Sequence, residues 1–217
     1  MKDIRAIGAA LMFSLSVSAN AIDFNQLDWR ESVTRDNLTI ELAPVEGQSI
    51  KAFRATSVYN ATLEQMVGII TDMSTFSKWV HGAEEAHVIK KLDHRSQACY
   101  YVNAIPWPLK NRDGVIVQTL ERVDDNTVRI NLSTMNELAE ENPKYVRIRQ
   151  LEGAWVLKRL NAQQVELTYL MHLDPTGNIP SPIVNLMLTE TPEKTLSNLH
   201  KMNLSHYNDS IAGLALE

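Results

Sequence analysis

The sequence has one cysteine among 217 residues, so no disulfide can form within the chain. Cys99 lies in a strand-like stretch, where a small buried hydrophobic side chain is its expected role. Long hydrophobic runs are also missing, because no stretch approaches the roughly 20 apolar residues that a bilayer-spanning helix needs. A chain of this length buries about 70% of its unfolded surface, which is enough for a core without metals or disulfides.

Catalytic and metal-binding motifs are scarce as well. The sequence contains no Gly-x-Ser-x-Gly elbow, no glycine-rich phosphate loop and no His-Glu-x-x-His zinc motif. Its six histidines are scattered, and His200 and His206 are six residues apart, on opposite sides of a helix. The sequence therefore predicts a noncatalytic protein with no catalytic residue, no metal site and no cofactor.

The beginning of the chain has the pattern of a secretory signal peptide. Lys2 and Arg5 precede residues 6–18, which are almost wholly apolar or small, and Ala19-Asn20-Ala21 has the small-x-small form that signal peptidase cleaves. We expect residues 1–21 to be removed and the mature chain to begin near Ile22. An uncleaved anchor is the alternative. Export without disulfides favours a bacterial periplasm over a eukaryotic secretory route.

The remaining residues, 22–217, form a mildly acidic chain. They carry 19 basic and 25 acidic side chains, a formal charge of −6. This charge argues against nucleic acid as a partner and against strong adhesion to anionic lipid. No linker, repeat or low-complexity run divides the segment, so we expect one monomeric domain whose membrane contact is hydrophobic and transient.

Hydrophobic periodicity predicts one early helix followed by an antiparallel sheet. Apolar residues at helical spacing, with a capping box formed by Thr62 and Gln65, predict a helix over 61–72. Alternating or β-rich runs follow, separated by turn-like residues. The predicted strands are residues 86–92, 97–105, 114–122, 126–134, 144–151, 153–160 and 164–173.

A second helical segment is predicted at the C-terminal end. Ser181 and Pro182 have the pattern of an N-cap and a first helical residue, and the segment continues to about residue 212. Pro192 should kink or break it. The expected class is α+β, and a strongly curved sheet wrapped on one helix leaves an internal hollow for a ligand.

One loop carries the clearest functional signal. Residues 106–113 read Pro-Trp-Pro-Leu-Lys-Asn-Arg-Asp. A tryptophan between two prolines is a rigid wedge suited to a bilayer interface, and an arginine held by its own aspartate can meet a phosphate or another polar headgroup. The structural alternatives are a buried Trp107 and an ion pair between Arg112 and Asp113 that never touches ligand.

This loop belongs to an ordered series of motifs. The series is Trp79, residues 106–113, Tyr145-Val146-Arg147-Ile148, Gly153-Ala154-Trp155, the Asp-Pro-Thr-Gly-Asn-Ile-Pro run at 174–180, and Asn185. In order and spacing it resembles the START domain, the steroidogenic-acute-regulatory-protein-related lipid-transfer module, over residues 29–205. The resemblance implies a helix-grip fold, in which a curved antiparallel sheet grips a long C-terminal helix around a hydrophobic tunnel.

The resemblance also implies roles for individual residues. Trp107 and Leu109 match the membrane-dipping tip. The second lip of the entrance, or lid, corresponds to Ile179, Pro180, Ile183 and Met187. Ligand-binding positions correspond to Tyr101, Arg112, Asp113, Asn131 and Tyr169, where Arg112 matches a phosphate contact and Asp113 is its expected partner. Val80 stands where a ceramide-transfer member has an acidic residue.

The residues themselves leave several of these roles open. Asn131 alternates with apolar neighbours and could simply face water. Tyr169 shares an apolar face of its strand, so core packing would also explain it. His172 lies on the opposite face, where it should be solvated or at the pocket rim.

The favoured function is noncatalytic binding of one lipid or sterol-like ligand, with transfer between membranes. A helix-grip enzyme, a cyclase or hydrolase acting on a hydrophobic substrate, is the first alternative. A lipid sensor that delivers no cargo is the second, because it would need the same pocket.

Overall fold

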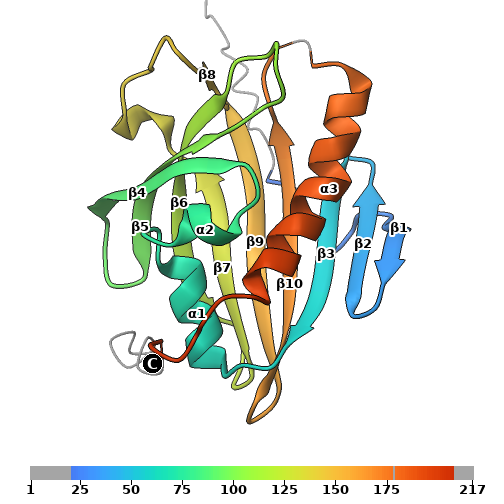
Figure 1. Ribbon diagram of the computed structural model, residues 1–217, viewed down its shortest axis with the longest axis vertical. Coiled ribbons are helices and arrows are strands. Elements are labelled where there is room, and N and C mark those ends of the chain that lie inside the picture. The colour runs from blue at the N-terminus through green and yellow to red at the C-terminus, as the bar shows by residue number, and fades with distance from the viewer. Residues whose placement is uncertain (1–20, 178, 208–217) are drawn as a thin grey trace, which may run out of the picture.

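A large curved sheet dominates the structure, a computed structural model that describes residues 21–177 and 179–207 (Figure 1). Within these residues the sheet has ten strands. They are β1 (Arg30–Arg35), β2 (Leu38–Ala43), β3 (Ala52–Tyr59), β4 (Ala83–Lys91), β5 (Ser96–Asn103), β6 (Arg112–Arg122), β7 (Thr127–Thr134), β8 (Val146–Arg147), β9 (Gln150–Asn161) and β10 (Gln164–Asp174). The helices are α1 (Leu63–Thr71), α2 (Phe76–Trp79), a short 3₁₀ turn (Asn136–Leu138) and α3 (Ser181–Leu199).

The strand order is β1-β2-β3-β10-β9-β7-β6-β5-β4. Neighbours along this path are antiparallel, and only the short β8 pairs in parallel, with β6. The last strand, β10, lies between β3 and β9. The three N-terminal strands are therefore joined to the rest of the sheet through β10. This confirms the predicted α+β helix-grip architecture.

The helices lie on the concave face of the sheet, and α3 crosses it in front of β3 and β10 (Figure 1). The predicted capping box is confirmed, because Gln65 N–H donates to Thr62 Oγ1 and Thr62 N–H donates to Gln65 Oε1. Helix α1 therefore begins at Leu63, two residues after the predicted start. The main core forms between these helices and the sheet. Trp79, Met66 and Leu196 are among its fully buried members.

Three N-terminal strands were not predicted. The first, β1, is exposed along almost its whole length and lacks the alternation that marks a half-buried strand. Strand β3 alternates clearly and pairs on one side with β2 and on the other with β10, which lies more than a hundred residues away in the sequence.

The strand boundaries around residue 150 also differ from the prediction. The structure has a two-residue β8 and one long β9 in place of two strands of similar length. Strand β9 runs through Gly153, where a Cβ atom would lie 2.4 Å from the Leu170 carbonyl oxygen. Glycine therefore permits a close approach to β10 rather than ending the strand.

The prediction that Pro192 would break the helix was wrong, because α3 continues through this residue. Helix α3 passes through Pro192 and ends at Leu199, and its N-cap is Pro180 rather than Ser181. Residues 208–212 of the predicted helical segment lie outside the described residues.

Candidate functional site

A cavity of about 380 Å³ lies between the concave face of the sheet and the helices. Its walls are predominantly apolar and aromatic. They include Phe53, Phe76, Val80, Tyr101, Ile105, Ile116, Leu132, Ile148, Leu151, Trp155, Tyr169, Met171, Leu173 and Met187. An apolar interior with a few polar groups is the usual form of a small-molecule site.

Three of the polar side chains that line the cavity lie together on two neighbouring strands. Asn103 on β5 is the direct cross-strand partner of Arg112 on β6, and Tyr101 is paired with Gly114. All three polar side chains line the cavity. Because residues two apart on a strand share a face, the pleat places this cluster at one end of the hollow. We call Arg112, Asn103 and Tyr101 the polar end of the cavity.

Two atoms of the polar end have no hydrogen-bond partner in the described structure. They are the Tyr101 hydroxyl oxygen and Asn103 Oδ1, both buried. A buried polar atom without a partner is costly, so such atoms are rare in folded proteins. Burial also raises the pKa of Tyr101, which keeps its hydroxyl protonated and able to donate. Gly114 makes room for this ring, since a Cβ there would lie 2.8 Å from the Tyr101 oxygen.

Arg112 is buried, with 4% of its surface exposed, and it bonds to backbone. Its Nε donates to the Pro175 carbonyl oxygen at 3.1 Å, Nη2 to that of Thr176 at 3.0 Å and Nη1 to that of Lys110 at 2.5 Å. These bonds tie the start of β6 to the loop that precedes α3. Burial lowers the pKa of Arg112. Among the described residues no carboxylate forms an ion pair with it, so its charge faces an apolar cavity without a counter-ion.

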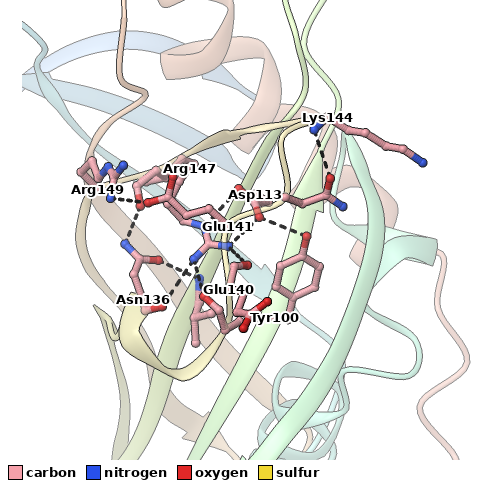
Figure 2. Close-up of polar contacts among 12 residues, drawn as sticks. Tyr100, Asp113, Asn136, Glu140, Glu141, Lys144, Arg147 and Arg149 are labelled. Carbon is pink, nitrogen blue, oxygen red and sulfur yellow. Dashed lines mark hydrogen bonds and ion pairs between the residues drawn. The ribbon is translucent and has the colours of Figure 1, made fainter.

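The expected ion pair between Arg112 and Asp113 is wrong, because successive strand residues point to opposite faces. Asp113 instead accepts from Arg147 Nη2 at 2.8 Å and Nε at 3.1 Å, and from the Tyr100 hydroxyl at 3.1 Å (Figure 2). Both charged side chains are at most 2% exposed. Arg147 also donates to the carbonyl oxygens of Asn136, Ala139 and Glu140. Asp113 thus lies in a closed network behind the sheet, away from the cavity, and a ligand-binding role for it is not supported.

The structure also places Asn131 outside the cavity. Its Nδ2 donates to Glu121 Oε2 at 2.9 Å, and its Oδ1 accepts from Arg129 Nε at 2.6 Å. These partners lie on the outer face of the sheet, opposite the buried Ile130 and Leu132. The expectation of a ligand contact is corrected accordingly, since the strand pleat turns this side chain away from the hollow.

Tyr169 does line the cavity. Its ring stacks on Trp155 with centroids 3.7 Å apart, and Phe53 meets it edge-on at 4.9 Å. Its hydroxyl donates to Met171 Sδ at 3.6 Å, and sulfur is a weak acceptor. Tyr169 is therefore part of the aromatic wall, with a hydroxyl that a better acceptor could attract.

The predicted membrane-contact residues lie at one end of the molecule. The loop between β5 and β6 and the loop between β10 and α3 meet there (Figure 1). Trp107 is 91% exposed, Pro180 is exposed, and Leu109, Ile179 and Ile183 are half-buried. Residues 104–106 and Met187 line the cavity itself, so this end forms its mouth.

Sequence reasoning missed Asn103, the cross-strand neighbour of Arg112. Strand alternation could have found it, since it lies two residues beyond Tyr101. His172 was wrongly expected at a wet position, because it is 1% exposed and its Nε2 lies 3.2 Å from the Ile50 carbonyl oxygen. Apolar side chains of residues 22–29 pack on the same outer face, against Ala154 and Leu170.

Two further kinds of site are absent from the described residues. No group of three or more His, Cys, Asp or Glu side chains there could hold a metal ion. In the same ranges, no helix combines the length and apolar character needed to cross a membrane.

Comparison with known proteins gave consistent results. The family model described as the START domain matches residues 15–206. An uncharacterized protein of Pseudomonas aeruginosa, PA1579, is 28% identical over 191 residues, which cover 88% of this chain and 92% of that protein. A crystal structure of a STAR-related lipid transfer protein fragment from Xanthomonas axonopodis superposes with a TM-score of 0.73 at 29% identity, covering 80% of this chain and 97% of that one.

A human relative matches over a shorter stretch. START domain-containing protein 10 is 22% identical over 143 residues, or 66% of this chain. The chain spans about half of that relative, since the match covers 49% of it.

Proposed function

This chain belongs to the START domain family, whose members bind lipids and sterols, and we propose that its cavity holds one lipid or sterol-like ligand. The head group of the ligand would lie at the polar end of the cavity and accept hydrogen bonds from Arg112. The observation that carries this proposal is the buried guanidinium, which faces an apolar cavity without a carboxylate partner among the described residues.

The chemistry of Arg112 points to the kind of head group. A guanidinium has five N–H donors, and three bonds to backbone carbonyls leave two for a ligand. An anionic acceptor such as a carboxylate or phosphate would compensate the buried charge, which a neutral group would not. The Tyr101 hydroxyl, which has no partner in the described structure, would donate a further hydrogen bond to this acceptor.

The size of the cavity limits the apolar part of the ligand. At about 380 Å³ it lies near the lower end of the roughly 300–1,000 Å³ range of small-molecule sites. This favours one compact apolar body over a lipid with two long chains fully enclosed.

We propose that the protein is a noncatalytic, monomeric carrier that transfers this ligand between membranes. Each methylene contributes about 0.8 kcal/mol to staying in an apolar medium, so a lipid rarely leaves a bilayer unaided. The exposed Trp107, with Leu109 and Ile179 beside the mouth, would contact the interface briefly while the lid of α3 loosens. The signal-peptide pattern supports export, with the bacterial periplasm as the proposed location.

The first test identifies what the purified protein holds. Native mass spectrometry of the exported protein, followed by organic extraction, should reveal one amphiphile per chain. Transfer between donor and acceptor vesicles then separates a carrier from a sensor. Hydrolysis or cyclisation of the bound molecule would instead support the enzyme alternative.

The second test targets the head group with a matched pair of probes, a long-chain fatty acid and the fatty alcohol of the same length. Arg112→Gln should weaken the acid at least about tenfold, because hydrogen bonds to charged groups are worth roughly 1.5–3 kcal/mol. The alcohol should change by less than about threefold. Equal losses for both probes would remove Arg112 from the site. The control is Arg149→Gln, an exposed arginine paired with Glu141.

A further inference from the structure

The backbone nitrogen of Ile22 lies 2.9 Å from Glu152 Oε2. Glu152 is on β9, and its side chain points to the outer face of the sheet, since its neighbour Leu151 lines the cavity. Ile22 is also the residue that would begin the chain after cleavage behind Ala19-Asn20-Ala21. The nitrogen that contacts Glu152 would therefore become the N-terminus of the cleaved chain, and its role would not depend on the cavity or its ligand.

Packing holds Ile22 in place. Residues 22–29 lie against the outer face, where Phe24, Leu27 and Trp29 form a small apolar cluster with Ala154 and Leu170. The Trp29 indole N–H donates to the Phe24 carbonyl oxygen at 3.0 Å. The contact with Glu152 therefore lies at the end of a packed segment and is not an isolated contact between two surface groups.

Glu152 has no cationic side chain paired with it in the described structure. Its cross-strand neighbour on β10 is His172, which is buried and bonded to the Ile50 carbonyl oxygen. Burial lowers the pKa of His172, which favours the neutral ring. The half-buried carboxylate therefore receives one hydrogen bond from a neutral amide as long as the chain is uncut.

We propose that cleavage between Ala21 and Ile22 creates an α-ammonium group that forms an ion pair with Glu152 and completes the attachment of residues 22–29 to the sheet. Hydrolysis adds water across this peptide bond, which leaves a carboxylate on Ala21 and an amine on Ile22. The amine takes a proton at neutral pH. The peptide bond is accessible, because Ala21 is exposed.

The ion pair would be stronger than the hydrogen bond it replaces. The ammonium carries a full positive charge opposite the carboxylate, whereas the amide carries only a dipole, so Coulombic attraction adds to the hydrogen bond. The ammonium also has three N–H groups where the amide has one. Processing would then stabilise the mature domain.

The first measurement is the intact mass of the exported protein, together with N-terminal sequencing. We expect a chain that begins at Ile22. Any other first residue overturns the proposal, because an ammonium elsewhere cannot occupy the position of the Ile22 nitrogen.

The second measurement is a double-mutant cycle on urea unfolding. It compares chains beginning at Ile22 or at Ala21, each with Glu152 or with Glu152→Gln. With Glu152 present, the chain that begins at Ile22 should have a folding equilibrium constant about fivefold larger than the chain that begins at Ala21. This is the size expected for a favourable ion pair of about 1 kcal/mol. In the Glu152→Gln background the two starts should be equal within about 1.5-fold.

A matched control is Glu166→Gln, which removes a carboxylate from the same outer face, on β10. It should leave the advantage of the Ile22 start intact. If the advantage survives in Glu152→Gln, or if all four chains are equally stable, the proposed ion pair is wrong.

Discussion

The two faces of β6 place adjacent residues in opposite chemical surroundings. On the inner face, Arg112 lines an apolar cavity and bonds only to backbone carbonyls. On the outer face, Asp113 is enclosed by Arg147 and Tyr100 in a network where both charges are compensated (Figure 2). The outer pair is complete within the protein, whereas the inner cation has room for a partner. The compensated pair stabilises the fold, and the cation without a counter-ion is suited to an anionic group of a ligand.

The same contrast appears one strand away. Tyr100 donates to Asp113, while Tyr101 points into the cavity and its hydroxyl has no partner there in the described structure. Replacing either tyrosine by phenylalanine removes only its hydroxyl group, so the two substitutions test the two faces of the sheet separately.

The largest expected effect comes from breaking the closed network. Asp113→Ala should lower the free energy of unfolding by about 3–5 kcal/mol, because it leaves the buried Arg147 without its counter-charge. Urea unfolding measures this loss. Glu141→Ala, which breaks the exposed pair with Arg149, is the control and should cost less than about 1 kcal/mol. Similar losses for both variants would contradict the contrast between buried and exposed pairs.

The tyrosine pair should respond in opposite ways. Tyr100→Phe should lower the free energy of unfolding by about 1 kcal/mol, because it removes a hydrogen bond to a buried carboxylate. Tyr101→Phe should leave the unfolding free energy unchanged within about 0.5 kcal/mol but weaken ligand binding several-fold. Urea unfolding and titration with the fatty acid probe measure the two quantities. If Tyr100→Phe alone weakened binding, the ligand would lie on the outer face of the sheet, and the proposed site in the cavity would be wrong.

Acid should destabilise the protein partly through the outer face. Burial lowers the pKa of His172, so the unfolded chain binds a proton more readily than the folded one. Its contribution to stability is full above about pH 6.5, the ordinary value, and is lost as the pH falls toward the lowered pKa. His172→Gln should reduce the loss of stability between pH 7 and pH 5, measured by urea midpoints. The exposed His87→Gln should leave that loss unchanged.

The smallest effect on stability is expected at the mouth. Trp107 is 91% exposed, so Trp107→Ala should change the free energy of unfolding by less than about 0.5 kcal/mol. It should nevertheless slow transfer between vesicles and leave equilibrium binding of ligand intact. Leu160→Ala, at a half-exposed site on β9, is the control for losing an apolar surface group. Equal slowing by both variants would argue against a specific docking role.

Several parts of the fold were predictable because their signals are local. The capping box of Thr62 and Gln65 announces α1, and the turns after β6 and β9 follow from short polar runs. Strand alternation assigned Tyr169 to the core face. The exposed β1 and the long β9 were not predictable in this way, since one lacks alternation and the other depends on how closely Gly153 approaches β10.

The sequence by itself determined which residues share a face, because a strand pleat has a period of two regardless of what surrounds it. That period separates Arg112 from Asp113 and places Arg112 with the residues of the cavity. Only the tertiary structure decided which arginine meets Asp113. Arg147 is 34 residues away, and the parallel pairing of β8 with β6 brings the two into register. Such a contact depends on chain topology, and no local pattern encodes it.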